Sequence, residues 1–293
     1  MEGRVLSGVG GFYTVLSDDG QRYTLRAQAK LRRQRMTPLV GDRVRFQPGS
    51  GDQHGWLEAI LPRQNQLIRP PVANIDHIAI VISAGAPEPD LMLVDRMLIF
   101  AKMNGIVPVL VINKCDEDAD GYARSIEEQY RGTGARVFRT CAADGAGLDE
   151  LRQALAGTVH ALGGQSGVGK STLINGLYGL NRETGSLSEK IERGKNTTRH
   201  CELIVLEGGG MVLDTPGFSL LELGLMDPVE LRNLIPEFEP YEGSCRFQPC
   251  VHVSEPGCSV RAAVDEGIIS KERWERYKAL HADMTQRWRD RYD

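Results

Sequence analysis

Short runs in which apolar and polar residues alternate occupy the first part of the chain. They read FYTVL, RYTLRA, DRVRF and GWLEAIL, and glycine-, aspartate- and proline-bearing segments separate them. Alternation with a period of two predicts half-buried strands, and the interruptions predict turns. Residues 1–70 are therefore expected to form a small five-stranded β-barrel of the oligonucleotide-binding type, ending at a linker that contains two prolines, LIRPPVANID.

From Ile75 the pattern changes to continuous apolar runs that alternate with longer amphipathic stretches. The runs IDHIAIVIS, IVPVLVINK, RVFRTCA and VHALGG predict buried parallel strands, and the stretches between them predict helices. This alternation is typical of a doubly wound α/β sheet, which we expect over residues 71–228. Residues 229–293 are expected to form a third unit, with a helix from about Ser270.

The last segment has apolar residues at helical spacing: Trp274, Tyr277, Leu280 and Met284. Arginines and lysines are expected on the other faces of this helix. The spacing predicts a packing helix. A contact between its basic side and RNA is the alternative that the sequence leaves open.

The charge distribution changes the picture more than the overall composition does. The net charge of −4 argues against indiscriminate binding of nucleic acid. The barrel segment nevertheless gathers eight basic residues against the single acid Asp42: Arg22, Arg26, Lys30, Arg32, Arg33, Arg35, Arg43 and Arg45. One face of the barrel is therefore expected to be positive, either as an RNA-binding face or as a solvated basic loop.

No stretch of the chain approaches the roughly 18 consecutive apolar residues that a membrane-spanning helix needs. The start of the chain also lacks a basic segment followed by an apolar one, the pattern of a secretion signal. We therefore expect a cytoplasmic protein that makes no membrane contact, and we expect a monomer.

The segment GGQSGVGKST matches the phosphate-binding pattern G-x-x-x-x-G-K-[ST], placed between a short strand and a helix. Glycines let backbone N–H groups surround the phosphates, Lys170 is expected to reach the terminal phosphates, and Ser171 is expected to ligate magnesium. The predicted phosphate-binding residues are Gly164, Gln165, Ser166, Gly167, Val168, Gly169, Lys170, Ser171 and Thr172.

Two later segments are expected to complete the phosphate site. GGGMVLDTPGF places Asp214 at the end of an apolar strand, where it can hold magnesium, and Gly217 can offer its N–H to the terminal phosphate. RGKNTTRH suits a switch loop in which Thr198 or Thr197 closes on the metal. A plain surface loop is the alternative for that stretch.

The motif NKCD predicts that the base is guanine. Asp116 can accept both N–H groups on one edge of guanine, whereas adenine offers a poor match. Asn113 and Lys114 belong to the same motif, and a second base-contacting loop is expected at Thr140, Cys141 and Ala142. We expect Cys115 and Cys141 to be small filling residues. The nucleotide is therefore expected to be GTP or GDP.

The order of these motifs is unusual, because the base-reading Asn113 precedes the phosphate loop at Gly164. In most GTPases the phosphate loop comes first. A circular permutation explains the order and keeps the sheet and the site intact. It also leads the chain from the segment Asp214–Gly217 directly into the C-terminal unit, so that nucleotide state can move that unit.

Four residues near the end have the spacing of a metal site: C-x4-C-x-H-x5-C, formed by Cys245, Cys250, His252 and Cys258. Three thiolates and one imidazole fill a tetrahedral zinc site, so one structural zinc ion is expected. The other cysteines, Cys115, Cys141 and Cys201, are scattered singly, which argues against a disulfide framework.

Together, NKCD, GGQSGVGKST, GKNTTRH and DTPGF, with the barrel before them and the zinc spacing after them, closely resemble the bacterial ribosome small-subunit-dependent GTPase A family. The resemblance covers nearly the whole chain. It implies a circularly permuted P-loop GTPase domain between an N-terminal barrel and a C-terminal zinc-binding helical domain. It also implies a magnesium-dependent GTPase that docks on the late-assembling small ribosomal subunit and its rRNA, is stimulated there, and then leaves.

The catalytic water is the part that the sequence assigns least directly. Phe218 stands where Ras-like enzymes carry a water-positioning Gln, so slow intrinsic turnover is expected. Members of the resembled family commonly carry a His before the Thr pair, and this chain has Asn196 there. The candidate catalytic residues are Asn196, Thr198 and His200.

Two other functions remain open at this point. One is a GTP-dependent binding switch whose zinc unit binds a protein partner. The other is an ATP-dependent small-molecule kinase, which would require NKCD to be accidental.

Overall fold

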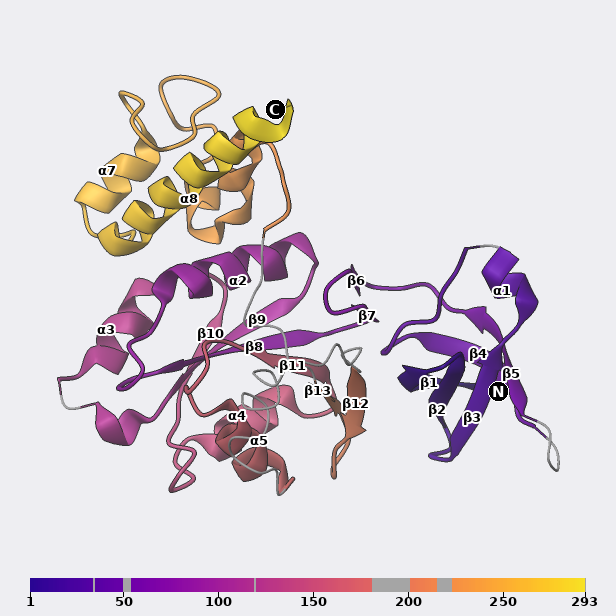
Figure 1. Ribbon diagram of the computed structural model, residues 1–293. Coiled ribbons are helices and arrows are strands. Elements are labelled where there is room, and N and C mark those ends of the chain that lie inside the picture. Colours follow the sequence, from indigo (N-terminus) through magenta and orange to yellow (C-terminus); the bar gives the residue numbers. More distant parts are fainter. Residues whose placement is uncertain (34, 50–53, 119, 181–200, 215–222, 293) are drawn as a thin grey trace.

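The structure is a computed structural model that describes the chain except residues 34, 50–53, 119, 181–200, 215–222 and 293. Figure 1 shows three parts: a barrel at one end, a central sheet covered by helices, and a helical C-terminal unit that lies over α2. Within the described residues, no helix has both the length and the apolar character that crossing a membrane requires.

The first part is the expected five-stranded barrel. Its strands are β1 (Glu2–Val9), β2 (Phe12–Ser17), β3 (Arg22–Ala27), β4 (Arg43–Gln47) and β5 (Gly55–Ile60). They pair in the order β1-β2-β3-β5-β4, and β4 pairs back with β1, which closes the barrel. A short helix, α1 (Ala29–Arg33), lies between β3 and β4. The interior holds seven buried apolar residues: Val5, Val15, Leu25, Leu31, Val44, Phe46 and Leu57.

Strand β1 joins the barrel to the central sheet. Its pairing with β2 shifts register between Val5 and Ser7, which is a β-bulge. The bulge lets two consecutive residues be buried, Val5 in the barrel core and Leu6 in the core of the central sheet. Ser7 then pairs with Glu202 at the edge of the central sheet. A single strand therefore contributes buried residues to two hydrophobic cores.

The central sheet has the doubly wound form that the sequence predicts. Its order is β10-β9-β8-β11-β13-β12, and all neighbours are parallel except β12 and β13. The strands are β8 (His77–Ser83), β9 (Val107–Asn113), β10 (Arg136–Arg139), β11 (Val159–Gly163), β12 (Glu202–Val205) and β13 (Met211–Asp214). The predicted phosphate loop and the two predicted base-contacting loops follow the carboxyl ends of β11, β9 and β10, which is where such folds bind ligands.

Helices cover both faces of this sheet. Alternate residues of β8 face opposite sides: Ile78, Ile80 and Ile82 share a core with α2 and α3, whereas Ala79 and Val81 share a core with α4 and α5. The helices are α2 (Leu91–Met103), α3 (Tyr122–Gln129), α4 (Leu148–Leu155) and α5 (Lys170–Tyr178). Figure 1 shows these two layers above and below the sheet.

The stretch expected to be a linker is folded. Residues 68–71 form the turn between two short paired strands, β6 (Gln66–Leu67) and β7 (Val72–Ala73). Leu67 and Val72 are buried in the core of the central sheet. The prolines in this segment lie in the turn, where no ladder hydrogen bond is needed, and apolar burial of the flanking residues orders the rest.

The C-terminal unit contains two 3₁₀ segments, two helices and a terminal 3₁₀ turn. They are η2 (Pro228–Leu234), η3 (Pro236–Tyr241), α7 (Ser259–Asp265), α8 (Lys271–Arg289) and η4 (Asp290–Tyr292). Ser270 caps α8 by accepting a hydrogen bond from the backbone N–H of Arg273. Tyr277, Leu280 and Met284 are buried as expected, but placing the arginines on other faces was wrong for Arg273, which is only 6% exposed.

Candidate nucleotide site and metal cluster

The loop between β11 and α5 is the predicted phosphate loop, and two of its glycines have no room for a side chain. Gly164 has a φ of 131°, and a Cβ there would lie 2.0 Å from the carbonyl oxygen of Val81. At Gly169 the φ is 90°, and a Cβ would lie 2.5 Å from the side-chain nitrogen of Asn113. The loop is therefore pressed against β8 and β9, and only glycine permits both contacts.

Lys170 begins α5 and points back under the loop. Its ammonium group donates hydrogen bonds to the carbonyl oxygens of Gly164, at 2.8 Å, and Gln165. Burial lowers its pKa to about 8. Ser171 and Thr172 follow in the first turn of α5. A loop of backbone groups closed around one partly buried cation, at a helix N-terminus, is suited to hold phosphate groups.

The remaining loop residues lie between Gly164 and Gly169. Ser166 and Gly167 are exposed at the tip of the loop, whereas Val168 is fully buried in the core under α5. Val168 therefore anchors the loop from below, and its neighbours are left free to approach a ligand.

Asn113, at the end of β9, ties the predicted phosphate loop to the predicted second base-contacting loop. Its side-chain nitrogen donates to the carbonyl oxygen of Val168 at 3.0 Å. Its side-chain oxygen accepts from the Thr140 hydroxyl and from the backbone N–H of Ala142, both at 3.1 Å. Asn113 is 1% exposed, so these bonds form in an environment where an unmade bond is costly. Three segments that are distant in sequence are thereby held in one place.

The other residues of the NKCD motif continue this site. Lys114 has a φ of 60° and donates from its ammonium group to the carbonyl oxygen of Ala86. Asp116 is exposed in the short segment η1 (Cys115–Glu117). The Asp116 carboxylate, followed by burial, raises the pKa of the Cys141 thiol, and burial raises that of Cys115. Both thiols therefore keep their protons at neutral pH, which agrees with a filling role.

The other predicted phosphate and catalytic residues are only partly covered by the structure. Asp214 is the last residue of β13, and β13 runs parallel to β11, with Leu213 opposite Ala161. Asp214 therefore lies at the edge of the sheet from which the phosphate loop leaves. Six residues lie outside the described part of the chain, so the roles expected for them stay predictions: Asn196, Thr197, Thr198, His200, Gly217 and Phe218.

The four predicted metal ligands are brought together. One ligand atom from each of Cys245, Cys250, His252 and Cys258 lies within 4.8 Å of the others, and all four residues are buried. Nδ1 of His252 lies 3.6 Å from Sγ of Cys245 and 3.4 Å from Sγ of Cys258. Around a tetrahedral ion bound by thiolate and imidazole, this separation is about 3.5 Å. The cluster therefore has the donor set and the size to hold a metal ion.

The chain around the cluster is held by hydrogen bonds that the sequence did not reveal. The Glu255 carboxylate accepts from three backbone N–H groups, those of Val251 at 2.7 Å, Val253 at 3.0 Å and Ser254 at 3.0 Å. The only sequence signal is an acid next to the turn-forming Pro256. By fixing the turn between the second and fourth ligands, Glu255 sets the position of His252.

Helix α8 and η2 hold the same loop from the other side. The Trp274 indole donates to the carbonyl oxygen of His252 at 2.7 Å, and the Tyr277 hydroxyl donates to that of Val251 at 2.6 Å. Arg232 donates to the carbonyl oxygen of Cys250 at 2.8 Å. The aromatic residues that the periodicity marked as packing residues therefore also orient the metal cluster.

The barrel presents exposed basic residues, as expected: Arg22, Arg26, Lys30, Arg33, Arg35 and Arg45. Asp42, the acid of this segment, is fully buried and paired with Arg63 at 2.7 Å, so it does not neutralise the surface. Arg26 lies beside Phe12 and Trp56 on neighbouring strands, with its guanidinium 4.4 Å from the Phe12 ring centroid. A cation between aromatic side chains is a surface on which nucleic-acid bases can stack.

Family models match most of the chain. The model of the RsgA N-terminal domain matches residues 2–57, and that of the RsgA GTPase matches residues 60–224. A Moorella thermoacetica protein named small ribosomal subunit biogenesis GTPase RsgA is 44% identical over 290 residues, or 99% of each chain. A protein of the same name from Caldanaerobacter subterraneus subsp. tengcongensis is 41% identical over 293 residues, covering 100% of this chain and 98% of that protein.

Two solved structures are similar over nearly the whole chain. The crystal structure of YjeQ from Thermotoga maritima has a TM-score of 0.83 and 34% identity, covering 97% of this chain and 98% of that one. The crystal structure of YloQ, described as a circularly permuted GTPase, has a TM-score of 0.81 and 33% identity, covering 98% of this chain and 95% of that one. The permuted fold expected from the motif order is therefore confirmed.

Proposed function

The chain belongs to the RsgA GTPase family, and from that premise we propose that it hydrolyses GTP to GDP and phosphate as an assembly factor of the small ribosomal subunit. The subunit stimulates hydrolysis, and the protein then dissociates. One observation carries the enzymatic part: Asn113 bonds both to Val168 of the phosphate loop and to the loop of Thr140 and Ala142. The same side chain thus holds together the segments proposed to bind the base and the phosphates.

The roles of the nucleotide-site residues follow from this arrangement. The phosphates lie against the backbone N–H groups of residues 164–172, with Lys170 pairing with the terminal phosphates. Asp116 reads the guanine edge, and Thr140, Cys141 and Ala142 line the other side of the base. Bound with GTP, magnesium neutralises charge on the phosphates, and Ser171, Asp214 and Thr198 supply the oxygen ligands that it prefers. Asn196 orients the attacking water, with His200 as the weaker candidate.

The metal of the C-terminal cluster is, on this proposal, a single structural zinc ion. Three thiolates and one imidazole at the observed separations suit zinc, and all four positions are filled by the protein. The ion therefore has no open position for catalysis. Its role is to order the C-terminal unit, by joining four residues of the loop 245–258 that hydrogen bonds from Glu255, Trp274 and Tyr277 also hold.

The partner is proposed from charge and from the names of the relatives. The exposed basic residues and the row of Phe12, Arg26 and Trp56 on the barrel suit rRNA. The units proposed are residues 1–70 for RNA binding, 71–228 for GTP hydrolysis and 229–293 for the zinc-bearing contact. The protein is proposed to act as a monomer in the cytoplasm, where small subunits mature.

Co-sedimentation with isolated ribosomal subunits tests this function. With a non-hydrolysable GTP analogue the protein is expected to sediment with small subunits, and with GDP the affinity is expected to fall about tenfold or more, because the two nucleotides stabilise different arrangements. Large subunits serve as the control and should not retain the protein. Equal retention by both subunits, or retention that ignores the nucleotide, would favour the alternative, a switch for a protein partner of the zinc unit.

A further inference from the structure

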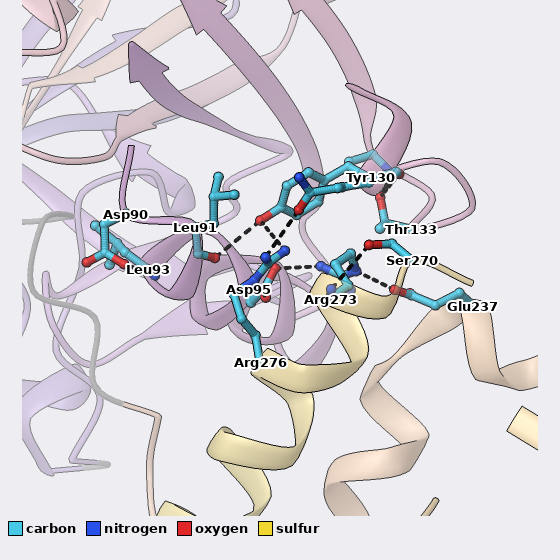
Figure 2. Close-up of polar contacts among 12 residues, drawn as sticks. Asp90, Leu91, Leu93, Asp95, Tyr130, Thr133, Glu237, Ser270, Arg273 and Arg276 are labelled. Atoms are coloured by element: carbon cyan, nitrogen blue, oxygen red, sulfur yellow. Dashed lines mark hydrogen bonds and ion pairs between the residues drawn. The ribbon is translucent and has the colours of Figure 1, made fainter. Parts of the chain in front are cut away.

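A buried ionic cluster joins the C-terminal unit to α2. Asp95 of α2 is 4% exposed, and each of its carboxylate oxygens pairs with a different arginine of α8. Arg273 lies 2.6 Å from Oδ1, and Arg276 lies 2.6 Å from Oδ2. Figure 2 shows this arrangement, with α8 crossing α2 at Asp95. Because both guanidinium groups must meet one carboxylate, the cluster permits a single orientation of α8 on α2.

Two further elements complete the cluster. Glu237 of η3 pairs with Arg273 at 2.5 Å. The Tyr130 ring, at the end of α3, faces both arginines, with ring centroid distances of 5.0 Å for Arg273 and 5.8 Å for Arg276. Loss of Asp95 would leave Arg273 buried with Glu237 as its acidic partner and would remove the carboxylate that pairs with the partly buried Arg276, which is unfavourable. When the two units separate, however, these charged groups are solvated by water, so the contact can open and re-form.

The N-terminal end of α2 touches the phosphate loop. Asp90, which caps α2, donates its backbone N–H to the side-chain oxygen of Gln165 at 2.8 Å. The side-chain nitrogen of Gln165 donates in turn to the carbonyl oxygen of Glu88 at 3.2 Å. Lys170 also donates to the backbone carbonyl of Gln165. Gln165, a residue of the phosphate loop, is therefore hydrogen-bonded to the start of α2.

The two contact points on α2, Asp90 at its start and Asp95 in its second turn, are close together. Asp95 lies less than two helical turns after Asp90, and the Tyr130 hydroxyl donates to the carbonyl oxygen of Leu91 at 3.2 Å, in the first turn. Arg276 also donates to the Tyr130 hydroxyl, at 3.4 Å. As Figure 2 shows, the start of α2 and the ionic cluster are thus part of one hydrogen-bonded group.

We propose that α2 couples occupancy of the phosphate loop to docking of the C-terminal unit, through Gln165 at its start and Asp95 in its second turn. The inference rests on the proposed binding of GDP and GTP at residues 164–172. A nucleotide that orders the phosphate loop fixes Gln165, Gln165 holds α2 in place, and α2 presents Asp95 to the two arginines. By reciprocity, docking of the C-terminal unit tightens nucleotide binding by the same factor.

Hydrogen exchange of the full-length protein with GDP as the probe tests this coupling. In the wild type, saturating GDP is expected to slow exchange of the α8 amides about fivefold or more. In Gln165→Ala, saturating GDP should no longer change α8 exchange, although this residue is remote from α8. Lys102→Gln is the matched control, since Lys102 pairs with Glu239 in an exposed contact between the same two units. It should behave as the wild type.

GDP titrations complete the test. Asp95→Asn is expected to weaken GDP binding about fivefold, and adding it to Gln165→Ala should cause no further loss, because the connection is already broken. Additive losses would overturn the coupling, and so would unchanged α8 exchange in a wild type that binds GDP. A wild type that does not bind GDP at all would instead refute the proposed function, together with the coupling. Gln165→Ala lies outside the interface and decides the matter alone if Asp95→Asn does not fold.

Discussion

Lys170→Ala is expected to lose nucleotide binding, with the affinity for both GTP and GDP falling about a hundredfold or more. A hydrogen bond to a charged group contributes about 1.5–3 kcal/mol, and this ammonium group meets the phosphates in a partly buried loop where water competes poorly. Isothermal titration with each nucleotide measures the loss. A variant that binds GTP with near-normal affinity would contradict the assignment of residues 164–172 as the phosphate loop.

The pH dependence of binding is the control for that result. Burial lowers the pKa of Lys170 to about 8 in the free protein, and bound phosphates favour its charged form, so binding takes up a proton above that pH. Wild-type affinity should therefore fall as the pH rises from 8 to 9. Lys170→Ala should lack this dependence, because the titrating group has been removed. A wild-type affinity that stays flat to pH 9 would show that Lys170 does not meet the phosphates.

Cys250→Ser is expected to lose its zinc and to unfold the C-terminal unit. Zinc binding supplies on the order of 10 kcal/mol of folding free energy in small zinc domains, and a serine hydroxyl does not replace a thiolate ligand. Metal analysis should find about one zinc per chain in the wild type and almost none in the variant. Hydrogen exchange should show α7 and α8 unprotected while the central sheet stays protected.

Nucleotide binding in Cys250→Ser should survive. Its GTP affinity is expected to fall by no more than the about fivefold factor that loss of docking at Asp95 predicts. Cys201→Ser is the matched control, since Cys201 lies outside the cluster, and it should keep its zinc. Stoichiometric zinc in Cys250→Ser would reject the ligand assignment.

Much of the fold follows from local pattern, and the exceptions have physical causes. Four barrel strands and the alternating strands and helices of the central sheet are visible as periodicity, because each element buries one continuous face. Strand β1 is not visible, since the bulge buries Val5 and Leu6 in different cores and breaks the alternation. The hairpin around Leu67 and Val72 is ordered by burial against distant strands, which the local prolines conceal.

The candidate sites also differ in whether the sequence reveals them. The phosphate loop and the metal spacing are compact motifs, and the structure brings together their described residues. The ionic cluster is invisible in the sequence, because Asp95 is separated from Arg273 by 178 residues and from Arg276 by 181. Within α2 it is a lone acid, and within α8 the two arginines look like solvated charges. Only the packing of the C-terminal unit on α2 gives these three residues a common role.

GTP hydrolysis by the purified protein, alone and with isolated small or large ribosomal subunits at fixed magnesium and salt, tests the account most directly. We expect slow turnover alone, strong stimulation by the small subunit, and none by the large subunit. A protein that binds GTP but is indifferent to the small subunit would contradict the assignment as a small-subunit assembly GTPase.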